Sequence, residues 1–204
     1  MLFYFLQGAT LAVSAAIMPG PYQAYLLSQA LRHGWKRALP AAFAPLATDG
    51  FIIAMVLFVL TRTPQAVLEM LRVAGGFFIL YLAIGIFMTF GRAKEVLTPP
   101  ENAARQTFIN AFIINVLNPN PYIFWGVVGG PIILTGWRTS PGLGIIFLAG
   151  FYGTFICSLA ALIIMFASAG RLDPKVNRVL GCGAALALVA FGLYQIVTGL
   201  KAVF

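Results

Sequence analysis

The segment Met18-Pro19-Gly20-Pro21-Tyr22 decides the fold of this chain, because it interrupts residues 1–31, a stretch without any charged side chain. Proline removes a backbone donor and clashes with the preceding helical turn, so two prolines one residue apart break a helix rather than bend it. An unbroken helix of about 30 residues would cover about 45 Å, against a hydrocarbon core of about 30 Å. The stretch therefore predicts a membrane span made of two half-helices, or of one strongly kinked and tilted helix.

A second segment, Asn118-Pro119-Asn120-Pro121-Tyr122, interrupts the charge-free run 106–137 in the same way. Gly34-Trp35 follows the first segment, and Gly136-Trp137 follows the second at almost the same distance. The two halves of the chain therefore resemble each other weakly, which indicates an internal repeat.

The composition is typical of a protein that lies in a membrane almost throughout. Of the 204 residues, 61% are hydrophobic and 9% are charged, whereas a soluble domain usually carries about 25% charged residues. We therefore predict an all-α integral membrane protein. Six transmembrane helices are expected, at about 2–31, 38–60, 73–90, 107–135, 142–168 and 179–200.

The prediction treats 1–204 as a single membrane domain with three parts. A first three-helix repeat covers 1–90, a cytoplasmic connecting loop covers 91–106, and a second three-helix repeat covers 107–204. Because each repeat holds an odd number of spans, the second enters the membrane from the opposite side. Many secondary transporters use such inverted repeats, with the substrate site near the midplane where the halves meet.

The net charge of +8 is distributed by loop and not as a patch for nucleic acid. Basic residues cluster in the connections after spans one, three and five, and the positive-inside rule places these connections in the cytoplasm and both termini outside. These are Arg32, Lys36, Arg37, Arg92, Lys94, Arg105, Arg171, Lys175 and Arg178. The opposite side holds Arg62, Arg72, Arg138 and Lys201.

Asp49 is the only carboxylate inside any predicted span. A charged side chain near the bilayer centre costs several kcal/mol unless it is paired or hydrated, so it marks a functional site by default. Desolvation favours the neutral form of such a carboxyl group, whereas neighbouring amides or a cationic substrate favour the charged form. Asp49 is therefore the candidate for substrate binding and for proton coupling, and a buried structural Asp is the alternative.

A helix break at membrane depth frees backbone amides and carbonyls, which are tolerated only where protein or a water-filled cavity satisfies them. Pro21 and Pro121 suit the first turn of a restarting helix, whose N-terminus can hold a carboxylate. The freed carbonyls can accept from an ammonium group. Each break thus offers both polarities that a zwitterion needs, and a packed structural kink is the alternative.

The predicted substrate-binding residues are the members of the two breaks and polar side chains at a similar depth. A tyrosine face can attract an ammonium group, although membrane tyrosines also serve as packing. Asparagines in spans can equally hydrogen-bond between helices. The candidates are Pro19, Gly20, Pro21, Tyr22, Asp49, Asn115, Asn118, Pro119, Asn120 and Tyr122.

In these motifs the chain resembles the lysine-exporter (LysE/RhtB) family of amino-acid translocators. The resemblance rests on Pro19-Gly20-Pro21, Asp49 and Asn118-Pro119, and covers nearly the whole length. It implies a multi-pass plasma-membrane protein of a bacterium or archaeon that exports amino acids or related small amines, typically driven by the proton-motive force. Thr48 and Asn120 stand where the family usually has Gly and Lys. The missing lysine bears on the substrate more than on the fold.

We therefore expect a secondary transporter, an antiporter that exchanges amino acids or amines for protons by alternating access. No enzyme activity and no cofactor are expected, and a homo-oligomer in the lipid bilayer is compatible with the sequence. A divalent-metal or cation exporter is one alternative, although the spans offer one carboxylate, two separate cysteines and no histidine. A non-transporting membrane assembly subunit is another, and it would need no carboxylate at the midplane.

Overall fold

The structure, a computed structural model, describes residues 1–55, 65–91, 101–172 and 174–203. No strand occurs in these ranges, so the all-α prediction is confirmed there. The helices are α1 (Leu2–Ile17), α2 (Pro21–His33), α3 (Trp35–Ala38), η1 (Leu39–Phe43), α4 (Ala44–Met55), α5 (Gln65–Gly91), α6 (Ala103–Leu117), α7 (Pro119–Phe124), η3 (Trp125–Gly129), α8 (Gly130–Thr139), α9 (Pro141–Leu172) and α10 (Pro174–Val203).

The helices identify a multi-pass membrane protein. Three of the helical segments described are long and apolar enough to cross a membrane, namely Trp35–Met55, Pro141–Ala169 and Arg178–Lys201. The bent pair of α1 and α2 gives a fourth if it is counted as one span. The count of six spans stays a prediction. Parts of two predicted elements, 56–60 and 92–100, lie outside the described residues.

Both proline segments break their helices, as the sequence predicts. Between α1 and α2 the chain turns by 68°, and Gly20 is extended before Pro21 opens α2. At the second break α6 ends at Leu117, and the helix restarts at Pro119, so that Pro121 lies in the first turn of α7. The restart is short, because a π-helical turn, η3, follows α7 directly.

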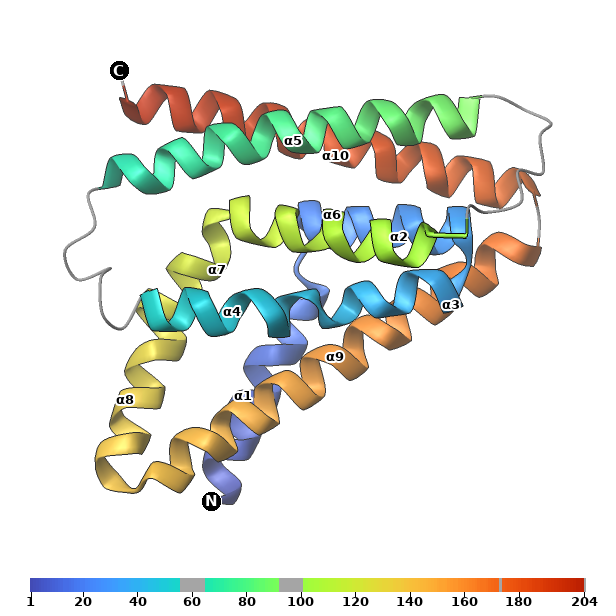
Figure 1. The fold of residues 1–204 in the computed structure, drawn as a ribbon. Helices are drawn as coiled ribbons and strands as arrows, with labels where there is room; N and C mark the ends of the chain where they lie inside the picture. The colour runs from blue at the N-terminus through green and yellow to red at the C-terminus, as the bar shows by residue number, and fades with distance from the viewer. Residues whose placement is uncertain (56–64, 92–100, 173, 204) are drawn as a thin grey trace.

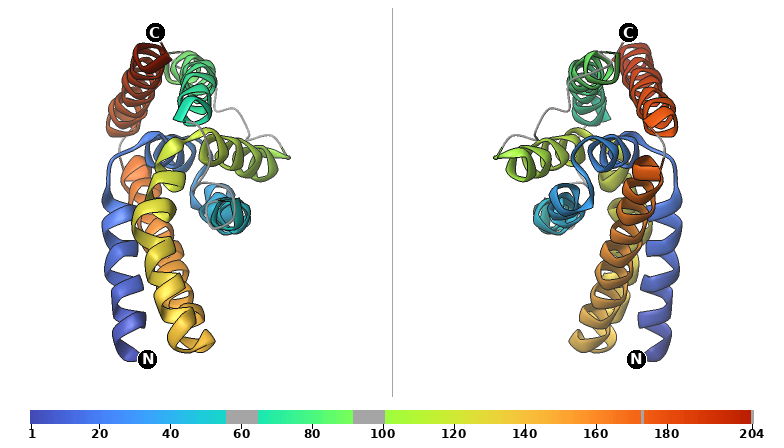
Figure 2. Two further views of the ribbon diagram at one scale, coloured as in Figure 1. Left: turned by 90° about the vertical axis from the view of Figure 1, so that its left-hand side faces the viewer. Right: turned by 90° about the vertical axis from the view of Figure 1, so that its right-hand side faces the viewer.

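The helices form a layered body with a projecting arm. Figure 1 shows α5 and α10 side by side and antiparallel, above α2 and α6, which also run antiparallel to each other. Figure 2 shows α1, α8 and the first part of α9 extending away from the α5–α10 pair. These antiparallel pairs are what an inverted repeat requires, although they do not test the repeat itself.

Glycines set the closest helix contacts. A Cβ atom on Gly192 of α10 would lie 3.0 Å from the carbonyl oxygen of Gly76 on α5, and one on Gly8 of α1 would collide with the carbonyl oxygen of Phe147 on α9. Small residues let membrane helices approach closely enough for backbone packing. Close contact between α5 and α10 thus stabilises the body, and close contact between α1 and α9 stabilises the arm.

The predicted cytoplasmic connections gather at one end of the molecule. In Figure 1, α3, the end of α5, the start of α6 and the α9–α10 junction all lie on the right. The C-terminus and the start of α5 lie on the left, and the N-terminus and the α8–α9 turn lie at the bottom. The segments that carry most of the basic residues therefore share one side.

Candidate binding site at Asp49

Asp49 points into the protein from α4, just after a stretch that prolines make irregular. Pro40 lies in the 3₁₀-helix η1 and Pro45 in the first turn of α4. Only 5% of Asp49 is exposed. This placement makes its carboxylate dependent on partners from the protein, because a buried charge without hydrogen bonds is costly.

Four neutral side chains donate hydrogen bonds to the Asp49 carboxylate. Oδ1 accepts from Nδ2 of Asn115 at 2.9 Å and from Oγ1 of Thr48 at 3.3 Å. Oδ2 accepts from Nε1 of Trp125 at 3.2 Å and from the hydroxyl of Tyr152 at 3.1 Å. The partners come from α4, α6, η3 and α9, so one carboxylate joins four elements.

This set of donors can serve both protonation states of Asp49. An ionised carboxylate only accepts hydrogen bonds, and an indole N–H only donates, so the arrangement as it stands suits the charged form. A protonated carboxyl group needs an acceptor, which the hydroxyl of Thr48 can become when its own proton is donated to the carbonyl oxygen of Ala44 or Pro45, each 3.2 Å away. A proton can therefore be taken up without leaving a buried donor unpaired.

A cavity of about 310 Å³ opens beside Asp49, between the two helix breaks and α9. The volume lies at the lower end of the roughly 300–1,000 Å³ that is usual for small-molecule sites. Seven of the predicted residues line this Asp49 cavity: Pro19, Gly20, Tyr22, Asp49, Asn115, Asn118 and Asn120. Pro21, Pro119 and Tyr122 are not among its lining residues.

The hydroxyl groups of Tyr22 and Tyr122 both donate hydrogen bonds to backbone carbonyl oxygens. The Tyr22 hydroxyl donates to the carbonyl oxygen of Ala41 at 2.5 Å. The Tyr122 hydroxyl donates to the carbonyl oxygen of Val116 at 2.9 Å, in the last turn of α6. Both side chains are buried. They therefore hold the breaks in place, whichever further role their rings have.

Protein side chains already satisfy part of the backbone that each break frees. Nε2 of Gln23 donates to the carbonyl oxygen of Ala15 in the last turn of α1, at 3.1 Å. The side chain of Asn118 accepts from the backbone N–H of Asn120 at 3.1 Å and caps α7. Fewer free amides and carbonyls therefore face a ligand than the sequence suggested, because groups at membrane depth need partners at all times.

The sequence does not predict a role for Trp125, Tyr152 and the phenylalanines around them. The Trp125 and Tyr152 rings stack with centroids 6.0 Å apart, and Phe151 lies edge-on to Trp125 at 5.0 Å. Phe124, Phe151 and Phe155 extend this aromatic wall along the Asp49 cavity. The sequence position of Trp125 and Tyr152 could have indicated them, because an indole or a phenol in the middle of a span, away from the membrane interfaces, needs a polar partner.

The part of the chain that the structure describes holds no group of three or more His, Cys, Asp or Glu side chains that could share a metal ion. Cys157 and Cys182 are both free thiols. The metal-exporter alternative therefore gains no ligand set from these residues.

Comparison with known proteins matches the chain to one family model and to one relative with a named activity. A family model described as LysE type translocator matches residues 13–199. The chain is also 24% identical over 202 residues, 97% of each chain, to the Bacillus subtilis (strain 168) protein named "Putative amino acid efflux protein YcgF". No solved structure matches the chain.

Proposed function

Because the chain belongs to the LysE type translocator family, we propose that it exports amino acids or related small amines across a plasma membrane. The family is one of translocators, so a transport role has support that an enzymatic role lacks. The name of the Bacillus subtilis relative, an amino acid efflux protein, supports the same substrate class. The observation that carries the proposal is a buried carboxylate in a cavity bounded by two helix breaks.

In the proposed complex, the substrate lies in the Asp49 cavity with its two charged groups on different elements. Its ammonium group lies near Asp49, the one carboxylate of the lining. Its carboxylate lies near Gly20, where the first turn of α2 presents N–H groups without acceptors inside the helix. The ammonium and carboxylate groups of a bound zwitterion thereby replace the water that would otherwise solvate Asp49 and the first turn of α2.

Proton coupling follows from competition at one carboxylate. Asp49 holds either a proton or the substrate ammonium group, so binding one favours release of the other. Both predicted repeats contribute to the cavity, since Gly20 and Asp49 lie in 1–90 and Asn115 and Asn118 lie in 107–204. Occupancy at Asp49 can therefore bias how the halves meet, and rocking of one half against the other exposes the site to each side in turn.

Efflux from proteoliposomes tests this proposal. The vesicles are loaded with a mixture of amino acids and amines, a pH gradient is imposed, and release is measured for the wild type and for Asp49→Asn. The variant keeps the size of the side chain, and its amide can still accept from Trp125, so it should fold. We expect wild-type release to follow the gradient and the variant to lose this response.

Glu101→Gln is the matched control, because it makes the same change at an exposed carboxylate. It should release substrate as the wild type does. A folded Asp49→Asn protein with full pH-driven flux would show that the proton coupling is elsewhere. A wild type that releases no amino acid or amine would overturn the export proposal itself.

A further inference from the structure

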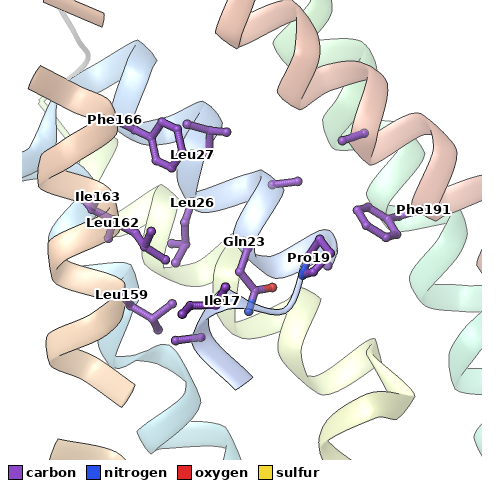
Figure 3. A pocket seen from close by; sticks show the side chains of 14 residues that line it. Ile17, Pro19, Gln23, Leu26, Leu27, Leu159, Leu162, Ile163, Phe166 and Phe191 are labelled. Atoms are coloured by element: carbon purple, nitrogen blue, oxygen red, sulfur yellow. The ribbon is translucent and has the colours of Figure 1, made fainter. Parts of the chain in front are cut away.

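A second cavity, of about 320 Å³, lies on the other side of the first helix break. Figure 3 shows its wall, with side chains from α2, α9 and α10 around the break. Leu26, Leu159 and Ile163 are buried in this wall, and Leu162, Phe166 and Phe191 complete it. Gln23 is the only polar side chain among the lining residues, so this apolar cavity can hold a hydrocarbon group but not a charged one.

The two cavities share a wall. Pro19, Gly20 and Gln23 line both of them. The Gln23 side chain is held across the break by the 3.1 Å bond to the carbonyl oxygen of Ala15. The Asp49 cavity and the apolar cavity are thus separated by the side chains of Gln23 and Pro19 and by the extended backbone at Gly20.

The charges around the two cavities fit one class of amino acid. Asp49 is the only ionisable acid or base among the lining residues, apart from the phenol of Tyr22. A basic side chain would bring a second cation without a second carboxylate, and an acidic one would bring an anion without a cation. Burying such an unpaired charge is strongly unfavourable. A neutral amino acid needs only the partners that are present.

We infer that the exported substrates are neutral amino acids with apolar side chains, bound with the head group at Asp49 and the side chain in the apolar cavity. The inference rests on the proposed function and narrows its substrate class. In this complex the Gln23 side chain turns aside and the substrate side chain passes the break. A lipid acyl chain is the competing occupant of the apolar cavity, and the experiment separates the two.

The test compares single substrates and one pair of variants. Proteoliposomes are loaded separately with leucine, phenylalanine, alanine, lysine or glutamate, and efflux is measured. We expect leucine and phenylalanine to leave about tenfold or more faster than lysine and glutamate, since the charged side chains of lysine and glutamate would be buried in the apolar cavity without a partner. Equal or faster efflux of lysine or glutamate would overturn the inference and leave the export proposal intact.

Ala187→Leu narrows the apolar cavity, because Ala187 lines it from α10. The ratio of phenylalanine efflux to alanine efflux should then fall at least about fivefold, because overfilling excludes the larger side chain first. Ala190→Leu makes the same change at an exposed position of the same helix and should leave this ratio as in the wild type. An unchanged ratio in Ala187→Leu would overturn the inference, because the substrate side chain would then not enter the apolar cavity, which a lipid acyl chain could occupy instead. Absence of all amino-acid efflux in the wild type would overturn the proposed function as well.

Discussion

At the scale of single residues, the cost of burying Asp49 is offset by hydrogen bonds, and the described residues that bond to it include no cation. Hydrogen bonds to a charged group contribute about 1.5–3 kcal/mol each, and Asp49 accepts four, all from neutral donors. Asn115 is central, because its Nδ2 also lies at hydrogen-bond distance from the Thr48 hydroxyl. A site built in this way leaves the carboxylate free to exchange these bonds for a proton or an ammonium group.

Trp125→Phe and Tyr152→Phe should each weaken transport and leave the fold intact. Each removes one of the two donors to Oδ2 of Asp49 but keeps an aromatic ring at its position. Efflux should fall about tenfold or more, in line with about 1.5–3 kcal/mol for a hydrogen bond to a charged group. Trp137→Phe and Tyr194→Phe are the controls, because these side chains are 50% and 66% exposed. Equal losses in the controls would contradict a specific role for the donors.

The sequence alone identifies Asp49 but not its partners. An acid inside an apolar run stands out from charge and hydropathy, because its solvation cost is local. Trp125 and Tyr152 reach it only because η3 and α9 pack against α4, and their separation of 76 and 103 residues from Asp49 gives no local signal. Asn115 is intermediate: the sequence predicts it as a site residue because it is a polar side chain in an apolar span, but the sequence does not predict its hydrogen bond to Asp49.

At the scale of elements, the two breaks are structurally unlike each other despite their similar sequences. The first leaves Gly20 extended and turns the chain by 68°. The second has an asparagine cap, a short helix and a π-helical turn. Proline content predicts both breaks because the missing donor acts locally. Asn118 contributes to the difference, because its side chain accepts a hydrogen bond from the first amide that the second break frees.

Asn118→Ala should destabilise the second break by about 1 kcal/mol, the usual value of an N-cap side chain. The bond lost is that from the N–H of Asn120 to Oδ1 of Asn118. Thermal unfolding in detergent measures the change. Asn102→Ala is the matched control, because Asn102 is the N-cap residue of α6 and its side chain makes no cap hydrogen bond. Equal unfolding temperatures of the two variants would show that the Asn118 cap contributes nothing.

Gly8→Ala should loosen the contact between α1 and α9 and destabilise the protein by about 1–3 kcal/mol, the cost of overpacking a tight contact. The added methyl group would meet the backbone of Phe147 and Phe151, which cannot move aside as a side chain can. Gly153→Ala on α9 has nothing within 4 Å of the new methyl group. It should be neutral or stabilising by up to about 1 kcal/mol, because alanine favours helix. Similar unfolding temperatures would contradict backbone contact at Gly8.

At the scale of the whole molecule, the distribution of basic residues and the directions of the helices agree on which connections lie on the same side. The sequence predicts which connections share a side from basic residues alone. In the fold, these connections meet at one end of the body, as Figure 1 shows. The sequence did not predict the arm of α1, α8 and α9, since its direction depends on the turn at the first break and on glycine contacts that form only after packing.

The orientation of the molecule gives the last prediction. Single cysteines at Lys36 and Ser140, both exposed, are introduced into a protein that lacks Cys157 and Cys182. If the basic connections face the cytoplasm, a membrane-impermeant maleimide applied to intact cells should label Ser140→Cys and not Lys36→Cys, and permeabilised cells should label both. The reverse pattern would place the termini inside. It would also place the basic connections outside, against the positive-inside rule.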